Sequence, residues 1–531
     1  MNAKFERIKN WIALFLLAFG FIVCLWLTLN IHRDLKPSGK RTLLLAHWQG
    51  ERGCREALDK VIKEYEKLHP DVEVRQQIIV GAGDAYVRWC VTQIIAGTMP
   101  DIMEYHGGFR PYLANYFAGL SDYVDKPNPY NKGNELEEIP WKDTFYGGMM
   151  GSWEPELLDY FTIPNTLYTM RFYCNKDMLR EAIGSNKLPE TMDEFFAVCE
   201  KLKEKGVIPV VAENISGDTG LQYFIKFFSQ MFWTLENSID YNHDGGVAYF
   251  EFYRGFLCGD VKFNTDRMKA LMELMKKSSD YWGKGANALS SDIAPYLFIQ
   301  GKGACYFCGS WLGRQMVQSC KFELGDFPFP LIGKDDPTAG RFYCGPWGEN
   351  LLQPGMSLAV ADTPNKDLAI DFLQFLTTRK NNGVFNAGPC WLPGVMGADI
   401  PPEMKGFKPL IRGKSIWPAF LSSAVNVEFK RLLQNYTGGT YGYGEFINEL
   451  ESTYAEYAPK DYDRYAVQSF QRLSKLEELR DRIDARRQEA ITLKKESPPE
   501  LIQQLQELYE YQIIGLNAIR AIHGAAPQGK E

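Results

Sequence analysis

The stretch that most constrains the fold is residues 163–212. In residues 167–174 the side chains at odd positions differ in kind from those at even positions. Such a period of two is the pattern of a β-strand, whose successive side chains point to opposite faces. A short helix follows, and Thr191 and Glu194 then form the capping box of a second helix. Residues 207–212 are an apolar, β-branched run that predicts a buried strand. The order strand, helix, helix, strand predicts an α/β domain with a parallel sheet.

The residues before this stretch show the same alternation of strands and helices. Residues 42–48 and 72–80 predict strands, residues 55–68 and 84–96 predict helices, and a third strand runs into Tyr105. Apolar side chains recur at helical spacing in the first of these helices, so one of its faces should pack on a sheet. The chain therefore opens with a β-α-β-α-β order.

Short motifs in these segments resemble those of one family of binding proteins. They are YCNKD at residues 173–177, PETMDE at residues 189–194 and GTMPD at residues 97–101. They resemble the patterns of the family 1 extracellular solute-binding proteins, the maltose-binding-protein-like receptors of ABC importers. Cys174 and Met192 stand where this family usually has tyrosine and tryptophan, so a ligand contact by that tyrosine is not implied here.

This resemblance covers about residues 42–455 and implies the architecture. The implied fold is α/β, of the type II periplasmic-binding-protein class, with two discontinuous lobes and hinges near residues 165, 332 and 378. Lobe 1 would comprise residues 42–165 and 333–378, and lobe 2 residues 166–332 and 379–455.

The N-terminus predicts a membrane anchor. Residues 11–31 contain no formally charged side chain and are long enough to cross a bilayer. An uncleaved anchor is favoured over a cleaved signal because no small residues follow the span. Cys24 raises a lipoprotein alternative, which is disfavoured because no small residue directly precedes it. Polar residues with Pro37 and Gly39 predict a linker at residues 32–41. Flanking charges leave the orientation open, but the resemblance implies that residues 1–10 are cytoplasmic and that the rest is extracytoplasmic, in the periplasm.

Residues 456–531 lie beyond the resemblance and predict a C-terminal helical extension. Apolar residues recur at helical spacing in residues 465–495, and a second helical pattern begins after Ser497-Pro498 and continues to about residue 523. Two helices joined by a short proline turn predict an antiparallel hairpin. Typical members of the family lack this hairpin.

Charge and cysteine usage narrow the function classes. The net charge of −7 disfavours nucleic-acid binding, which needs a basic face. One of the eleven cysteines lies in the predicted span, and the remaining ten permit disulfides. Cys305 and Cys308 form a C-x-x-C without a matching second pair, which makes zinc binding unfavourable. Buried thiols or one structural disulfide are favoured over redox chemistry.

One loop fits the pattern of a calcium site. Residues 240–251, DYNHDGGVAYFE, match the spacing of oxygen ligands, glycine and late glutamate that Ca²⁺ coordination requires. The ordinary alternative is a polar turn between two regular elements. The candidate ligands are Asp240, Asn242, Asp244, Gly246 and Glu251.

The candidate ligand-binding residues follow from the chemistry of sugars. Sugars stack their C–H faces on aromatic rings, and their hydroxyl groups need acids, amides and arginine. In the family that this chain resembles, such residues lie at strand ends facing the gap between the lobes. The positions that match are Trp48, Glu104, Tyr105, Trp311, Arg314, Trp347, Glu349 and Trp391, with Trp233 as a further candidate on a helix. The alternative for each tryptophan is a place in the core of a lobe.

The sequence therefore predicts a receptor that captures a carbohydrate, an oligosaccharide or a sugar derivative, and delivers it to an ABC transporter permease. No cofactor is required by this interpretation, and no G-x-S-x-G, H-E-x-x-H or Walker motif indicates an enzyme. Two alternatives stay open. One is a carbohydrate-active enzyme using the same cleft, since a glycosidase carboxylate pair has no local motif. The other is a membrane-tethered sensor or scaffold whose hairpin recruits a partner.

Overall fold

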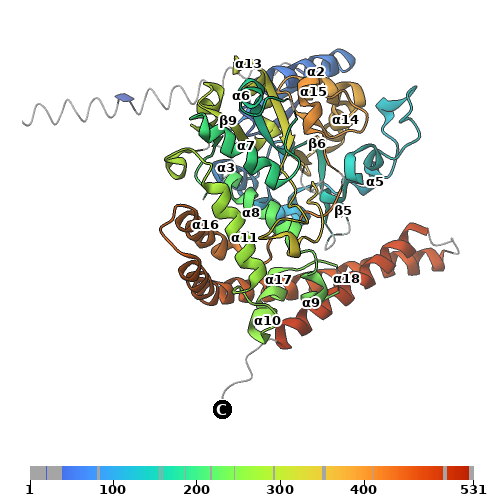
Figure 1. Cartoon of the computed structure of the whole chain (residues 1–531). Helices are drawn as coiled ribbons and strands as arrows, with labels where there is room; N and C mark the ends of the chain where they lie inside the picture. The colour runs from blue at the N-terminus through green and yellow to red at the C-terminus, as the bar shows by residue number, and fades with distance from the viewer. Residues whose placement is uncertain are drawn as a thin grey trace, which may run out of the picture.

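Two β-sheets, each with its own hydrophobic core, organise the molecule (Figure 1). The computed structural model describes residues 19–20, 39–79, 84–154, 157, 159–185, 187–215, 218–243, 245–290, 293–349, 354–410, 412–493 and 499–524. In one core, Leu43 and Leu45 pack with Tyr65, and in the other Phe172 and Phe195 lie 4.9 Å apart between ring centroids. The two-lobed α/β fold predicted from the sequence is confirmed.

The larger sheet has six strands. Their order is β12 (Leu392–Pro393), β6 (Thr162–Leu167), β11 (Met356–Val360), β3 (Ile102–Glu104), β1 (Arg41–His47) and β2 (Val72–Ile78). Strand β1 is parallel to β2 and β3, whereas β11 is antiparallel to both of its neighbours. The helices of this lobe are α2 (Cys54–Leu68), α3 (Asp84–Ala96), α4 (Leu113–Tyr116), α5 (Ser121–Val124), α14 (Lys366–Leu376) and α15 (Arg379–Ala387).

The smaller sheet has four strands and is mixed. Their order is β10 (Leu324–Pro328), β7 (Met170–Asn175), β9 (Gly303–Gly309) and β8 (Ile208–Val211). Strand β9 runs antiparallel to β7 and parallel to β8, so the purely parallel sheet expected here is wrong. The period of two identifies a strand, but it carries no information about the direction of a partner that lies about 130 residues away in the chain.

The helices of the smaller lobe include the predicted capping box. They are α6 (Lys176–Ile183), α7 (Met192–Glu204), α8 (Asp218–Met231), α9 (Glu236–Ile239), α10 (Tyr249–Cys258), α11 (Asp266–Ser279), α12 (Ala294–Ile299), α13 (Gly313–Ser319) and α16 (Ser423–Thr437). At the start of α7 the Glu194 N–H donates to the Thr191 hydroxyl, while the Glu194 carboxylate accepts from the Thr191 N–H. Gly206 then ends the turn after α7 with a φ of 72°.

Several segments connect the two sheets. Residues 168–169 join β6 to β7, and residues 329–355 lead back from β10 to β11. After β11 the chain stays on the larger sheet longer than expected, because β12 pairs with β6 and Asn382 of α15 donates to Asn165 Oδ1 at 2.7 Å. The last return to the smaller lobe therefore lies after residue 393, later than the position near residue 378.

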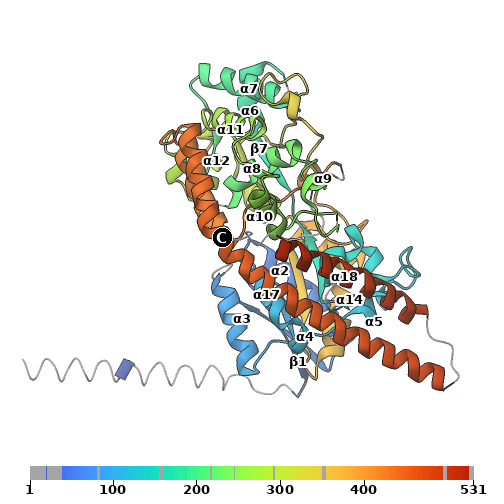
Figure 2. The same cartoon turned by 90° about the horizontal axis from the view of Figure 1, so that it is seen from below.

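The C-terminal region forms two long helices that run beneath the two lobes (Figure 2). Helix α17 (Tyr443–Thr492) is continuous across residue 456, where the extension was expected to begin, and it contains Pro459. Helix α18 (Pro499–Gly524) returns along it. The predicted helical hairpin is present, but its first helix is also a part of the smaller lobe.

The predicted membrane span, residues 11–31, lies outside the described residues apart from Phe19 and Gly20. Within the described part of the chain, no helix combines the length and the apolar character that membrane crossing requires.

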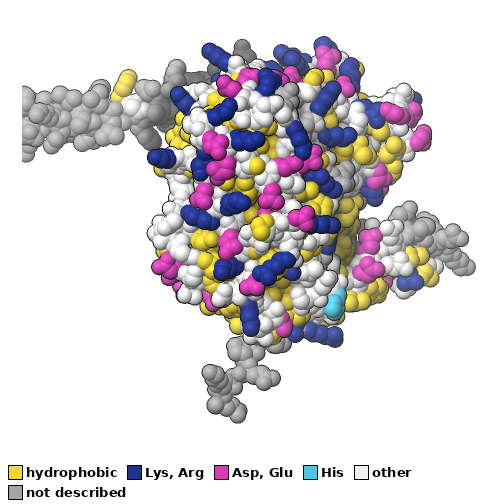
Figure 3. Space-filling view, in the orientation of Figure 1, with side chains coloured by type: hydrophobic (Ala, Val, Ile, Leu, Met, Phe, Trp, Pro, Cys, Tyr) yellow, Lys and Arg dark blue, Asp and Glu magenta, His cyan; other side chains and the backbone are white. Residues whose placement is uncertain are grey.

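The ten described cysteines are all free thiols, and these include Cys305 and Cys308. On the face seen in Figure 3, basic and acidic side chains are interspersed, which suits a solvated surface.

Candidate functional site

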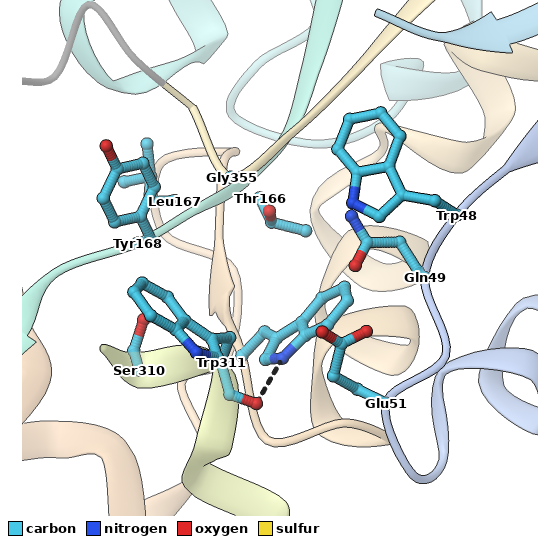
Figure 4. Close-up of a pocket in the computed structure, with 10 residues that line it drawn as sticks. Trp48, Gln49, Glu51, Thr166, Leu167, Tyr168, Ser310, Trp311 and Gly355 are labelled. Atoms are coloured by element: carbon cyan, nitrogen blue, oxygen red, sulfur yellow. Dashed lines mark hydrogen bonds between the residues drawn. The ribbon is translucent and has the colours of Figure 1, made fainter. Parts of the chain in front are cut away.

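A cavity of about 280 Å³ lies where the ends of both sheets meet. Its lining comes from the end of β6 and the segment that joins it to β7, and from the segments after β1, after β9, before β11 and before β12. The lining residues are Trp48, Gln49, Glu51, Thr166, Leu167, Tyr168, Ser310, Trp311, Gly355 and Trp391. In Figure 4, Trp48, Gln49 and Glu51 lie on one side, opposite Tyr168, Ser310 and Trp311.

Glu104 positions the side of the cavity that is formed by the segment after β1. This side chain is fully buried at the end of β3, and its carboxylate accepts from the Trp48 N–H at 3.2 Å and from the Gln49 side-chain amide. The Trp48 ring packs edge-on against Tyr86, with ring centroids 4.8 Å apart. Burial raises the pKa of Glu104 well above its usual range, although both hydrogen bonds oppose this shift. Glu104 therefore positions the cavity loop but does not line the cavity.

Glu51 presents a buried carboxylate oxygen at the cavity. Its Oε2 is buried, and no group of the described residues hydrogen-bonds to it. Burial raises the pKa of the Glu51 carboxyl, because the charged form loses hydration that the protein replaces only in part. A buried acceptor without a donor is costly, and a ligand that donates a hydrogen bond to this atom would remove the cost.

The opposite side of the cavity is built around Trp311. The ring of Trp311 lies over Gly309, where a Cβ would overlap the indole, and its centroid is 5.9 Å from that of Tyr168. Trp391 donates its indole N–H to the Trp311 carbonyl oxygen at 3.2 Å. Three indoles and one phenol thus surround a cavity that also contains a buried carboxylate. These side chains offer a ligand apolar ring faces together with a strong hydrogen-bond acceptor.

Comparison with known proteins identifies the family. The model of the bacterial extracellular solute-binding proteins matches residues 52–383. The chain belongs to this family.

Two curated relatives and one solved structure are similar to this solute-binding protein. An uncharacterized ABC transporter extracellular-binding protein of Pyrococcus horikoshii is 25% identical over 286 residues, which are 52% of this chain and 57% of the relative. The multiple sugar-binding protein of Streptococcus mutans is 23% identical over 289 residues, or 51% of this chain and 59% of the relative. The chain thus aligns with less than two thirds of the length of each of these two relatives. A chitin oligosaccharide binding protein has the same fold, with a TM-score of 0.55, 19% identity and coverage of 80% of this chain and 100% of that one.

Of the nine predicted ligand-binding residues, the cavity of this solute-binding protein brings together Trp48, Trp311 and Trp391. Tyr105 packs edge-on against Phe109 in the larger lobe, and the Arg314 guanidinium lies 3.9 Å from the Cys390 sulfur. These two side chains are outside the cavity lining.

Trp233, Trp347 and Glu349 also lie outside the lining of this cavity. The Trp233 ring lies against Gly345, with the Lys414 ammonium 5.8 Å from its centroid. Trp347 is fully buried and donates its indole N–H to the Phe329 carbonyl oxygen at 2.9 Å, so it belongs to the core of the smaller lobe.

Glu349 belongs to a buried cluster of charges. It accepts a hydrogen bond from Arg171 Nη1 at 2.5 Å, and the Arg171 side chain is completely buried. The Lys226 ammonium lies 3.9 Å from the centroid of the Trp347 ring, and burial lowers the pKa of Lys226 to about 8. This pairing indicates that Glu349 stabilises the smaller lobe by compensating two cations.

The residues that the sequence analysis missed lie next to ones that it found. Gln49 and Glu51 follow Trp48 directly after β1, and Ser310 precedes Trp311 after β9. Tyr168 lies in the two-residue segment that joins the sheets. Their position next to strand ends was an available signal, but it does not suffice, because Glu104 and Tyr105 at the end of β3 lie outside the cavity lining.

In the described structure, two carboxylates of the calcium-like loop accept hydrogen bonds from backbone N–H groups of the same loop. Glu251 is fully buried, and its two carboxylate oxygens accept from the Asn242 and Ala248 N–H groups at 3.0 and 2.9 Å. The Gly245 N–H donates to the Asp240 carboxylate at 3.0 Å. Asp244 lies outside the described residues. Among the residues that are described, no cluster of three His, Cys, Asp or Glu side chains could hold a metal ion, and calcium binding stays a prediction.

Replacing Glu251 with glutamine tests these two roles. The glutamine amide nitrogen cannot accept one of the two backbone N–H bonds, so we expect a loss of about 1 to 2 kcal/mol in the free energy of unfolding. Urea unfolding should show the same loss in EDTA and in millimolar Ca²⁺. A loss seen only with Ca²⁺ would instead identify Glu251 as a metal ligand.

Proposed function

We propose that this solute-binding protein captures a carbohydrate, an oligosaccharide or a sugar derivative, in the cavity between its sheets. The observation that carries the proposal is the placement of Trp48, Trp311 and Trp391 around the buried Oε2 of Glu51, which has no hydrogen-bond partner among the described residues. Indole faces stack on the C–H faces of sugar rings, and a carboxylate accepts strongly from a sugar hydroxyl. The relative named as a multiple sugar-binding protein and the neighbour named for chitin oligosaccharides support this ligand class.

Delivery to an ABC importer is a part of the same proposal. The Pyrococcus horikoshii relative is named as an extracellular-binding protein of an ABC transporter. Ligand would bind the closed arrangement of the lobes preferentially, and the closed form would dock on the permease. An anchor at residues 11–31 would hold the receptor on the periplasmic face of the cytoplasmic membrane.

A thermal-shift screen tests the ligand class. The purified protein would be heated with oligosaccharides, sugar phosphates and peptides, each in large excess. A ligand at a hundred times its dissociation constant adds about 2.7 kcal/mol to the free energy of unfolding, which shifts the melting temperature visibly. A response to peptides alone would contradict the proposal.

The pH dependence of binding tests the role of Glu51. Burial raises the pKa of this carboxyl, and a hydrogen bond donated by a ligand hydroxyl would favour its ionised form. Affinity for the sugar should therefore increase as the pH rises from about 4.5 through the raised pKa. Because hydrogen bonds to charged groups exceed neutral ones by about 1 kcal/mol, we expect roughly a fivefold change.

The control for this experiment is Glu51→Gln, which retains the shape of the side chain without a titrating group. Calorimetric titration of this variant should give weaker binding that is nearly constant over the same pH range. An identical pH profile in the variant and the wild type would assign the titration to another group.

A further inference from the structure

Helix α17 begins as a structural part of the smaller lobe. Phe446, Leu450 and Tyr454 are buried in the core of that lobe, and Tyr454 packs edge-on on Phe256 of α10 with ring centroids 5.1 Å apart. Farther along α17, Tyr465 stacks on Phe250 at 4.8 Å. Helix α18 returns to the same place, where Ala518 packs against Phe250. We call this buried base the root of the hairpin.

The far part of the hairpin reaches the larger lobe. Leu476 and Ile483 of α17 and Leu505 and Leu508 of α18 form one apolar cluster, and Trp153 packs against it. The Trp153 indole N–H donates to the Tyr511 hydroxyl at 3.2 Å. We call the contact of Trp153 with this cluster and with Tyr511 the foot.

Trp153 is fixed firmly to the larger lobe. It lies in β4 (Trp153–Glu154), which pairs with β5 (Asp159–Tyr160), and its ring centroid is 5.0 Å from that of Tyr160. Tyr160 belongs to the core of the larger lobe, and Glu154 forms a salt bridge of 2.9 Å with Arg110. Movement of the larger lobe therefore carries Trp153 with it.

The hairpin thus touches both lobes, but it does so unequally (Figure 2). Its root is continuous with the core of the smaller lobe, whereas its foot on the larger lobe centres on one tryptophan. Leu476 follows Tyr454 by 22 positions, which correspond to about 33 Å along the helix, and the pairing with α18 stiffens the second half of this length. A rotation of one lobe against the other must slide or break the foot, because the root cannot move separately from its lobe.

We propose that the C-terminal hairpin is an interlobe strap, which limits lobe opening through the foot on Trp153. The strap acts whatever solute fills the cavity, so this inference goes beyond the proposed sugar binding. The strap raises the population of the described lobe arrangement above the level that the hinge segments alone would give. Release of the foot would widen the range of lobe arrangements.

The test removes the foot from the hairpin side. Tyr511→Ala deletes the ring and hydroxyl that meet Trp153, and Tyr509→Ala is the matched control because Tyr509 is 49% exposed on the same helix. Full-length protein without ligand would be measured by small-angle X-ray scattering and by hydrogen exchange. We expect a larger radius of gyration and about tenfold faster exchange around residues 505–511 in Tyr511→Ala, and neither change in Tyr509→Ala.

A second variant guards against damage to the hairpin itself. Trp153→Phe retains a ring for packing on Tyr160 but removes the N–H donor, and it should shift both readouts in the same direction by a smaller amount. Faster exchange with unchanged scattering in Tyr511→Ala would overturn the strap, since the foot would then pack without restraining the lobes. Unchanged exchange and scattering in both variants would overturn it as well.

Discussion

Replacing Trp311 with alanine is expected to weaken binding of the sugar about 30-fold. The indole of Trp311 forms the centre of one cavity side, where it meets the Tyr168 ring, and the backbone carbonyl oxygen of Trp311 accepts the Trp391 indole N–H. Truncation of a central aromatic residue in a binding site costs about 2 kcal/mol, which corresponds to this factor. The fold should persist, because the ring is only partly buried and its removal leaves the Trp391 hydrogen bond to the backbone in place.

The matched control is Trp417→Ala. Trp417 is 45% exposed and lies outside the cavity lining, so its loss should leave the affinity unchanged within about twofold. Calorimetric titration of both variants with the oligosaccharide that binds the wild type gives the comparison. Equal affinities of Trp311→Ala and the wild type would show that the sugar does not occupy this cavity.

Replacing Glu349 with glutamine is expected to lower the free energy of unfolding by about 3 kcal/mol. The carboxylate is the partner of the buried Arg171 at 2.5 Å, and its charge also opposes the lowering of the pKa of Lys226. Removal of one member of a buried ion pair leaves an uncompensated charge, with a cost of about 3 to 5 kcal/mol. The lower end applies because Lys226, with a pKa of about 8, can lose its proton in the variant.

Urea unfolding at pH 7 measures this loss, with Glu323→Gln as the control. Glu323 pairs with Arg180 at 2.5 Å, but both side chains are about half exposed, so this change should cost much less than Glu349→Gln does. The deficit of Glu349→Gln should shrink between pH 7 and pH 9, because Lys226 becomes neutral in the folded protein above its pKa of about 8. Equal losses for the two variants would contradict the structural role of Glu349.

The local patterns of the chain predicted its elements well. The capping box of Thr191 and Glu194, the strand at β7 and the opening helices are all set by neighbours within a few residues, and the structure contains them. Three tryptophans of the cavity were also found, because each stands at the end of a strand.

The errors arose where distant contacts decide the structure. Trp347 and Glu349 occupy an irregular segment, and contacts with residues far away in the sequence, among them the buried Arg171 and the Phe329 carbonyl oxygen, hold them in the smaller lobe. The late return to the smaller lobe depends on the pairing of Asn382 with Asn165, which are 217 residues apart. No periodicity along the chain reports such contacts.

The measurement that tests the central claim most directly is calorimetric titration of the purified wild-type protein with a panel of oligosaccharides, followed by analysis of the same samples for cleaved or modified sugar. We expect saturable binding of at least one carbohydrate at one site per chain, with the sugar recovered unchanged. Steady formation of product would identify an enzyme in this cleft. Absence of heat with every carbohydrate, together with saturable binding of a ligand of another class, would contradict the sugar receptor.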